Sequence, residues 1–442
     1  MNRRAQFATR MGVVATTVGS AVGLGNIWRF PYEAGTHGGG AFLLCYLFFI
    51  FVIGVPVISA EFVMGRASRS GIIGSFRCHS GSRRWDWIGY SSILAAILIL
   101  SFYSVVAGWT MEYTCESVIG RLGDVADDAR HDRFDGFISG WGSVWWMLVF
   151  LLINALVLLG GVKKGIERMS NILMPLLFLI LLVFCVNSLL MSGAAEGLAF
   201  LFSPDFNAIT PGVVLGAMGQ AFFSLSIGLG CMMTYASYFS DRTPIVKSAT
   251  TTALLDTLVA VLSGVIIFPA VFSFGMEAEA GPKLVFEVLP SVFGRLSGSD
   301  VWSALFFFLL ALASLTSTIS MSEIFISFAC DEFRMSRRTA TVLLTLIAMS
   351  LGTLCALSFG PLRDFTLWGK TFFDLFDYVS SNILLPVGGM VISLFVGWRL
   401  DRDTLVSQLN GNGRLPHWVM TWIVVSLRYI APLCILAVFL AS

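Results

Sequence analysis

Charged residues and histidine are scarce in this sequence. Charged residues make up 12% of its 442 positions, and only four residues are histidines. The formal net charge is +1 and the basic residues are dispersed along the chain, whereas a protein that binds a polyanion needs a clustered basic surface. The composition therefore excludes nucleic acid as an expected partner.

Motifs for metal, redox and nucleotide chemistry are also missing. The eight cysteines show no CxxC spacing, and most of them fall in or beside apolar stretches. No Walker motif occurs, so ATP is not the expected energy source. The four histidines fall in loops or at a helix end, away from the buried hydroxyl groups. We therefore expect a protein that is not an enzyme.

Apolar residues are abundant. They make up 56% of the chain, and the mean hydropathy is +0.83, which is typical of a protein that crosses a membrane several times. Hydropathy predicts an all-α membrane protein with eleven transmembrane helices. The expected spans are residues 10–34, 40–65, 86–120, 143–160, 168–191, 212–240, 245–274, 300–331, 338–358, 373–398 and 417–440.

The loops between these spans predict an orientation. Most of the 28 Lys and Arg residues fall in loops that share one side with the N-terminus. Because basic loops stay on the cytoplasmic side, we expect a cytoplasmic N-terminus and an external C-terminus. The polar segment from about 275 to 298 is too short to span and is expected to form an external loop or lid.

The tripeptide Gly-Leu-Gly interrupts two of the expected spans, at residues 23–25 and at residues 228–230. A lone GxG in a membrane helix usually serves close helix packing. Two copies in spans one and six, with five spans in each unit, favour a five-plus-five repeat whose second unit is inverted. The expected units are residues 1–191 and 192–398, followed by 399–442 with the eleventh helix. Such broken helices place a transport site near the bilayer midplane.

Polar residues within the apolar spans are expected to face one another, because an isolated acid at a helix centre costs about 2.5–3.5 kcal/mol. Their oxygen-rich side chains suit a hard cation such as sodium better than zinc or copper. For the hydroxyls of the run Thr316-Ser317-Thr318, bonding back to their own helix is the alternative. The set comprises Asn26, Glu61, Tyr103, Gln220, Ser224, Ser226, Asp256, Thr316, Ser317 and Glu323.

Several motifs resemble one family. The run from Ala8 to Gly65, with GLGNIWRFP followed by GGGAF, strongly resembles the first two helices of the neurotransmitter:sodium symporter family. The sequence GQAFFSLSIGLGCMMTYASY resembles its sixth helix. The resemblance covers nearly the whole chain and implies the LeuT-type fold of bacterial amino-acid transporters, with broken helices one and six.

The resemblance implies two sodium ions and one amino-acid substrate. The first ion would bind Ala21, Asn26, Ser224, Asp256 and the substrate carboxylate. The second would bind Gly19, Val22, Ala313, Thr316 and Ser317. The substrate carboxylate would meet the amides of Leu24 and Gly25 and the hydroxyl of Tyr103. The implied substrate residues are Ser20, Ala21, Gly23, Leu24, Gly25, Ile99, Tyr103, Phe223, Ser224, Ser226, Leu229, Ser317 and Met321.

Two further features follow from the resemblance. Gly23 stands where monoamine-carrying relatives have Asp, which favours a substrate with its own carboxylate, and the apolar pocket suits a large hydrophobic amino acid. Outer and inner gates are also implied, although an ordinary surface pair worth about 0–1 kcal/mol is the alternative for the outer one. The gate residues are Arg29 and Asp377 outside, with Tyr103 and Phe223 beneath, and Arg4, Asp331, Ser237 and Tyr238 inside.

Chloride dependence is left open by the motifs. Tyr46, Gln220 and Ser224 match the chloride positions of relatives, but Ala260 replaces a serine and Asp256 stands where many relatives have Asn. Our hypothesis is that Asp256 itself supplies the negative charge that offsets sodium, because a buried cation needs local compensation.

The sequence thus predicts a sodium-coupled symporter that carries an amino acid inward across a bacterial inner membrane by alternating access. One alternative is a proton-driven carrier that uses Asp256 or Glu61. A second alternative is a receptor on the same scaffold that binds an amino acid without transporting it, since fold does not imply function.

Overall fold

The computed structural model describes residues 6–121, 127–275, 285–286, 290, 293, 298–410 and 415–441, with the backbone alone for 127–131 and 441. Helices make up nearly all of this part of the chain. The described residues contain no β-strand, only an isolated bridge between Leu367 and Lys370. The segment expected to form an external lid lies mostly outside the described residues.

Nine helices in the described part are long and apolar enough to cross a membrane, or ten if one bent pair counts as a span. Several contain a short segment labelled η, which is 3₁₀-helical in η3 and π-helical in the other η segments of these spans. In chain order, the elements of these nine spans are α3 (Gly40–Phe49), η2 (Ile50–Gly54) and α4 (Val55–Ser68); η3 (Arg83–Trp85) and α6 (Asp86–Val118); α8 (Trp141–Leu159); η4 (Val162–Glu167) and α9 (Arg168–Leu189); α13 (Ile245–Ser273); α15 (Ser299–Glu332); α16 (Arg337–Leu357); α17 (Phe372–Asp377), η7 (Tyr378–Leu384), α18 (Leu385–Leu394) and η8 (Phe395–Arg399); and α20 (His417–Val425), η9 (Ser426–Ile430) and α21 (Ala431–Ala441).

The bent pair carries the first Gly-Leu-Gly tripeptide. Helix α1 (Arg10–Ala21) ends just before it, and η1 (Gly25–Arg29) with α2 (Phe30–Thr36) continues at an angle of 57°. The expected sixth span is also divided, into α11 (Pro211–Ser224) and the short α12 (Cys231–Ala236). Neither α11 nor α12 is long enough by itself to cross a membrane. The total of eleven membrane spans therefore stays a prediction.

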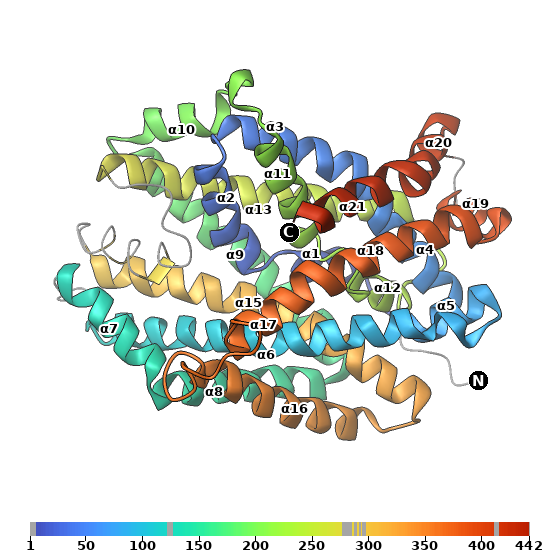
Figure 1. Ribbon diagram of the computed structural model, residues 1–442, viewed down its shortest axis with the longest axis horizontal. Coiled ribbons are helices and arrows are strands. Elements are labelled where there is room, and N and C mark those ends of the chain that lie inside the picture. Colours follow the sequence, from blue (N-terminus) through green and yellow to red (C-terminus); the bar gives the residue numbers. More distant parts are fainter. Residues whose placement is uncertain are drawn as a thin grey trace.

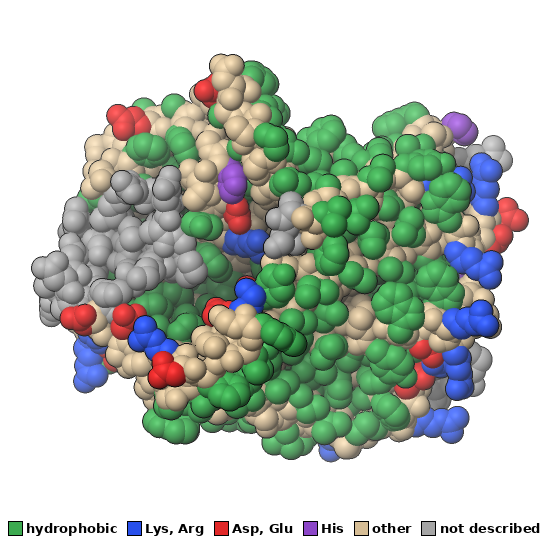
Figure 2. All heavy atoms as spheres, viewed as in Figure 1, with side chains coloured by type: hydrophobic (Ala, Val, Ile, Leu, Met, Phe, Trp, Pro, Cys, Tyr) green, Lys and Arg blue, Asp and Glu red, His purple; other side chains and the backbone are tan. Residues whose placement is uncertain are grey.

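Short helices connect these spans at the two ends of the molecule. They are α5 (Ile72–Ser80), α7 (Asp127–Ser139), α10 (Ala194–Phe202), η5 (Phe206–Ala208) and α19 (Arg402–Asn410). Figure 1 shows α7 and α10 at the end opposite the N-terminus, and α5 and α19 at the end near it. Figure 2 shows Lys and Arg side chains gathered at the end with α5 and α19, beside a broad apolar surface.

The broken helices lie in the middle of the bundle (Figure 1). Helix α1 packs against α9, α13 and α15, and α12 packs against α4 and α15. These neighbours all belong to spans long enough to cross a membrane, so they surround the two interruptions with ordered helices. The interruptions are therefore enclosed by protein rather than exposed to lipid, as freed backbone in a membrane requires.

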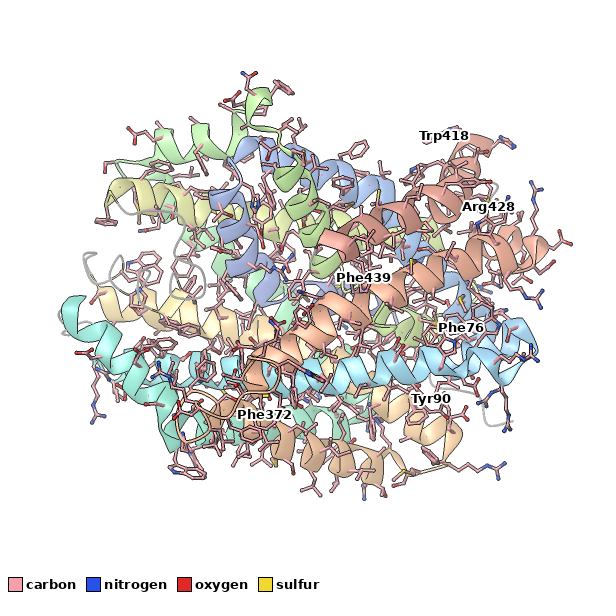
Figure 3. The ribbon with its side chains drawn as sticks, viewed as in Figure 1. Phe76, Tyr90, Phe372, Trp418, Arg428 and Phe439 are labelled. Carbon is pink, nitrogen blue, oxygen red and sulfur yellow. The ribbon has the colours of Figure 1, made fainter. Side chains whose placement is uncertain are left out.

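Arg428 is a basic residue within the last span and is labelled in Figure 3. Its Nε donates to the carbonyl of Gly397 at 2.6 Å, and its guanidinium carbon lies 5.0 Å from the centre of the Trp398 ring. The indole of Trp398 donates in turn to the Arg428 carbonyl at 3.2 Å. A charge in a membrane helix needs partners of this kind, and these contacts join η8 to η9.

Helices α4 and α12 approach each other so closely that only glycine fits between them. A Cβ atom added to Gly65 of α4 would lie 1.9 Å from the carbonyl oxygen of Met233 in α12. A backbone atom at this distance cannot rotate out of the way, so a side chain at position 65 would force the two helices apart. Close packing of small residues is a common way for membrane helices to associate.

We therefore expect Gly65→Ala to lower the free energy of unfolding by about 1 to 3 kcal/mol, as overpacking does. Gly136→Ala in α7 is the matched control, because a Cβ there meets nothing within 4 Å and alanine favours a helix by up to about 1 kcal/mol. Thermal unfolding of the detergent-solubilised proteins measures both. Equal unfolding temperatures for the two variants would contradict the packing argument.

Candidate functional site

The first helix break is held open by side chains from two neighbouring helices. The amide of Gly23 donates to Asn26 Oδ1 at 3.0 Å, and the amide of Leu24 donates to the hydroxyl of Tyr103 on α6 at 2.9 Å. Ser317 Oγ on α15 donates to the Val22 carbonyl at 2.9 Å. Two amides and one carbonyl at the break are thus paired within the protein, as a membrane environment demands of freed backbone groups.

Glycine at position 23 is required by this arrangement. A Cβ atom there would lie 2.7 Å from Ser317 Oγ and 2.8 Å from the Tyr103 hydroxyl. Any larger residue would displace one of the two groups that satisfy the break. The first Gly-Leu-Gly tripeptide therefore serves close approach to a polar site.

Asn26, Ser224 and Asp256 form one buried polar cluster. Asn26 Nδ2 donates to Asp256 Oδ1 at 2.8 Å and to Ser224 Oγ at 2.9 Å, and Ser224 Oγ donates to Asp256 Oδ2 at 2.6 Å. The Tyr46 hydroxyl approaches Ser224 Oγ at 3.3 Å, and all four side chains are buried. The cluster joins the first break to the end of α11 and to the middle of α13. Its carboxylate and hydroxyl oxygens are hard ligands of the kind that hard cations such as calcium prefer, and the Asn26 amide oxygen, which accepts the Gly23 amide, lies on the same side chain.

A second group of predicted ligands lies where α1 meets α15. A Cβ on Gly19 would lie 3.3 Å from the Cβ of Thr316, so the two helices are in close contact here. The Thr316 hydroxyl donates to the carbonyl of Ala313 at 3.0 Å, which is the bonding within the helix that the sequence left as an alternative. Ser317, in contrast, bonds across to the Val22 carbonyl of the break.

A small cavity of about 30 Å³ lies between the two breaks. Most of the predicted substrate residues line it, and Ser20 and Leu24 do not. Leu385 of α18 also lines it and was not predicted, because nothing in an apolar helix sequence distinguishes a leucine facing a cavity from one facing lipid. The lining residues are Ala21, Gly23, Gly25, Asn26, Ile99, Tyr103, Phe223, Ser224, Ser226, Leu229, Ser317, Met321 and Leu385.

The second break depends on glycine conformation and on Glu61. Gly228 and Gly230 have φ values of +87° and +81°, which only glycine adopts without strain. The Glu61 carboxylate of α4 accepts the amides of Gly228 at 3.0 Å and Met233 at 3.2 Å. The carboxylate thus lies at the N-terminus of α12, where the helix dipole favours negative charge. The sequence identified Glu61 as a polar residue in an apolar span and as a candidate group in the proton-driven alternative, but not as a partner of the second break.

At the end opposite the N-terminus, Arg29 and Asp377 have separate partners. The Arg29 guanidinium carbon lies 4.2 Å from the centre of the Phe223 ring, and its Nε lies 3.5 Å from a Glu33 oxygen. Asp377 accepts a hydrogen bond from Ser381 at 2.8 Å. Among the ion pairs of the described residues, none joins Arg29 to Asp377.

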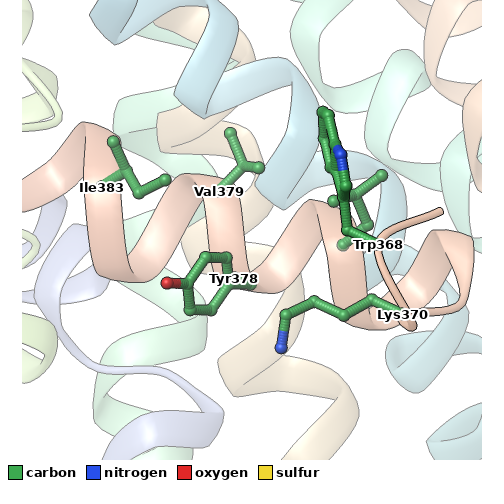
Figure 4. A pocket seen from close by; sticks show the side chains of 6 residues that line it. Trp368, Lys370, Tyr378, Val379 and Ile383 are labelled. Carbon is green, nitrogen blue, oxygen red and sulfur yellow. The ribbon is translucent and has the colours of Figure 1, made fainter. Parts of the chain in front are cut away.

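A larger cavity of about 530 Å³ lies along α17 and η7 at this same end. Figure 4 shows Trp368, Lys370, Tyr378, Val379 and Ile383 around it. The Lys370 ammonium lies 4.3 Å from the centre of the Tyr378 ring, a cation–π contact. Figure 2 shows a hollow with acidic and basic side chains at this end of the molecule.

The end near the N-terminus contains a buried ionic cluster centred on Glu323. Arg337 donates to its two carboxylate oxygens at 2.9 and 2.5 Å, and the Tyr238 hydroxyl donates at 2.6 Å. The sequence predicted Tyr238 as an inner gate residue but missed Arg337, which lies fourteen positions after Glu323 at the start of the next helix. Asp331 accepts the amide of Gly71 at 3.0 Å. Of the other predicted gate residues, Ser237 bonds to the carbonyl of Thr234 at 2.5 Å and Arg4 lies outside the described residues.

The chain is similar to known membrane transporters along its whole length. Residues 4–126 and 132–442 match the model of the sodium:neurotransmitter symporter family. An uncharacterized sodium-dependent transporter, YhdH of Bacillus subtilis, is 38% identical over 437 residues, covering 98% of this chain and 97% of the relative. The bovine sodium-dependent dopamine transporter is 26% identical, covering 99% and 69%. The crystal structure of MhsT in complex with L-phenylalanine aligns with a TM-score of 0.91 and 42% identity, covering 99% of each chain.

The Glu323 cluster generates a stability prediction. Because Glu323 is fully buried, Arg337→Met leaves its carboxylate without a counter-charge and is expected to cost about 3 to 5 kcal/mol of unfolding free energy. The double variant Glu323→Gln with Arg337→Met should recover most of that loss. Thermal unfolding in detergent compares the two proteins. A double variant no more stable than Arg337→Met alone would show that buried charge is not the cause.

Proposed function

Because this chain belongs to the sodium:neurotransmitter symporter family, we propose that it couples sodium entry to the inward movement of an amino acid. It is an integral membrane transporter that uses sodium, and it is not an enzyme. The single observation that carries the proposal is the cluster of Asn26, Ser224 and Asp256, which gathers hard oxygen ligands where the two broken helices meet.

One sodium ion is proposed to bind this cluster together with the Ala21 carbonyl. The substrate carboxylate completes its shell. Shared coordination makes the binding of ion and substrate reciprocal, since each raises the affinity for the other by the same factor. This is the physical basis of coupling, because neither ligand alone stabilises the closed arrangement fully.

A second sodium ion is proposed to bind where α1 meets α15. Its ligands are the carbonyls of Gly19, Val22 and Ala313 and the hydroxyls of Thr316 and Ser317. The Ser317 contact with the Val22 carbonyl supports this assignment, because it brings two of these oxygens within 2.9 Å. The ion would link the broken helix to an unbroken one.

The substrate is proposed to be a hydrophobic amino acid. The amides of Leu24 and Gly25 and the Tyr103 hydroxyl are suited to bind its carboxylate, with the carbonyls near Phe223 and Ser226 binding its ammonium group. The side-chain end of the cavity carries Ile99, Leu229 and Met321, which favour an apolar group. The structural relative MhsT holds L-phenylalanine in its crystal, in keeping with this class.

Alternating access is proposed to operate through gates at both ends. Arg29 would exchange Glu33 for Asp377 as the outer end closes over Phe223. Asp331 and Tyr238, with Arg4, would form the inner gate. We place the chain in a bacterial cytoplasmic membrane with eleven spans, the N-terminus inside and the C-terminus outside. Inverted five-helix units then occupy 1–191 and 192–398, with 399–442 following.

The purified protein in proteoliposomes is expected to accumulate radiolabelled L-phenylalanine only under an inward sodium gradient. Competition with each amino acid in turn then identifies the substrate, and hydrophobic amino acids should compete best. Uptake driven by a proton gradient without sodium would replace this proposal with a proton-coupled carrier. Tight binding without accumulation in the vesicles would instead indicate a receptor.

Asp256→Asn is expected to reduce sodium-driven uptake about tenfold or more in chloride-free medium, because it removes the negative charge that offsets the buried cation. Added chloride should restore part of the activity by supplying that charge. Asp205→Asn is the control, since Asp205 is exposed and caps η5, a role that Asn also fills. Wild-type uptake by Asp256→Asn in both media would refute the role of this carboxylate.

A further inference from the structure

Leu385 reaches the central cavity from a span that contributes no predicted substrate residue. It is the first residue of α18, is 8% exposed, and lines the same cavity as Ile99, Leu229 and Met321. The other lining residues come from the two breaks and their adjoining helices, from α6 and from α15. The span that contains α18 therefore supplies an additional wall.

The backbone of α18 lies directly against the second helix break. A Cβ atom added to Gly228 would lie 2.3 Å from the Leu385 carbonyl oxygen and 2.4 Å from the Gly389 nitrogen. On the other side of the contact, a Cβ on Gly388 would lie 2.4 Å from the Gly228 carbonyl. No side chain fits between the two segments. The position of Leu385 is thus fixed relative to Leu229, the next residue after Gly228.

The backbone of Gly228 also forms hydrogen bonds with side chains of two other helices. Its amide donates to Glu61 at 3.0 Å, and its carbonyl accepts a hydrogen bond from Ser92 of α6 at 3.3 Å. The wall formed by Leu229 and Leu385 therefore rests on a backbone that α4, α6 and α18 hold in place together. Because this backbone cannot move outward to admit a larger group, the two leucines limit the size of the ligand that fits in the cavity.

The wide π-helical segment η7 precedes Leu385 and determines the direction in which it points. One extra residue in a helical turn rotates every later side chain by roughly 100° about the axis. Short π-helical segments of this kind occur frequently at functional sites. The segment η7 runs from Tyr378 to Leu384 and ends at the residue before Leu385. It therefore decides which face of α18 meets the cavity.

We propose that Leu385 determines substrate specificity by limiting the length of the side chain that the cavity accepts. The inference rests on the proposed function, since it assumes that an amino acid binds between the two breaks. Its isobutyl group and that of Leu229 form one apolar wall. A smaller residue at position 385 deepens the pocket, and a larger residue shortens it.

The test compares sodium-driven uptake of labelled L-tryptophan and L-leucine by proteoliposomes that contain the full chain. Leu385→Ala is expected to raise the ratio of kcat/KM for tryptophan over leucine about tenfold, and Leu385→Phe to lower it by a similar factor, the size of effect that one or a few carbon atoms have in an apolar pocket. Leu385→Val should give a smaller shift in the same direction as alanine. The ratio does not depend on how much protein is active.

Leu384→Ala is the matched control, because Leu384 is the adjacent, partly buried leucine and does not line the cavity. Its ratio should equal that of the wild type. Unchanged or reversed ratios in the Leu385 variants overturn the inference and leave the proposed function intact. Absence of sodium-driven amino-acid uptake by the wild type overturns the proposed function itself. Should a variant not transport, the ratio of binding affinities for tryptophan and leucine is measured instead, from the thermal stabilisation of the purified protein by each amino acid, and the same directions are expected.

Discussion

A helix can be interrupted inside a membrane only if every amide and carbonyl that it frees finds a partner within the protein. The rest of this structure depends on that constraint. At the first break the partners are Asn26, Tyr103 and Ser317, and at the second break the main partner is Glu61. Each partner comes from a different helix or from the break itself. The need to satisfy the backbone therefore gathers polar side chains from several spans at one place.

Three of the buried carboxylates among the described residues, those of Glu61, Asp256 and Glu323, are balanced in three different ways. Glu323 has the guanidinium of Arg337, and Glu61 has backbone amides at the N-terminus of α12. Among the described residues, the hydrogen-bond donors to the Asp256 carboxylate are the neutral side chains of Asn26 and Ser224. Neutral donors stabilise a buried charge less than an opposite charge does. A bound cation would therefore stabilise the charge of Asp256 more than that of Glu61 or Glu323. This agrees with the proposed place of Asp256 in the sodium site.

Sequence reasoning predicted the family and brought together most of the residues that line the central cavity, because these depend on residues with distinctive local signals. The two Gly-Leu-Gly tripeptides marked the breaks, and Asn26, Ser224 and Asp256 were conspicuous as polar residues in apolar spans. Long-range consequences of packing were not predictable. Leu385 gives no signal, since its direction depends on a π-helical segment, and the partner of Glu323 lies on the next helix. Arg29 contacts Glu33 rather than Asp377. The choice between these partners depends on the conformation of the protein, which a sequence motif does not specify.

The glycine contact between α4 and α12 has a mechanical consequence. Gly65 meets Met233 with no intervening side chain, Glu61 bonds to the start of α12, and Arg69 bonds to the carbonyl of Phe239 just beyond its end. These attachments are spaced along the whole of α12, so it has no freedom to hinge against α4. Helices α4 and α12 therefore form one rigid unit. A displacement of α12 must carry α4 with it, and the hinge must lie at the glycines of the second break.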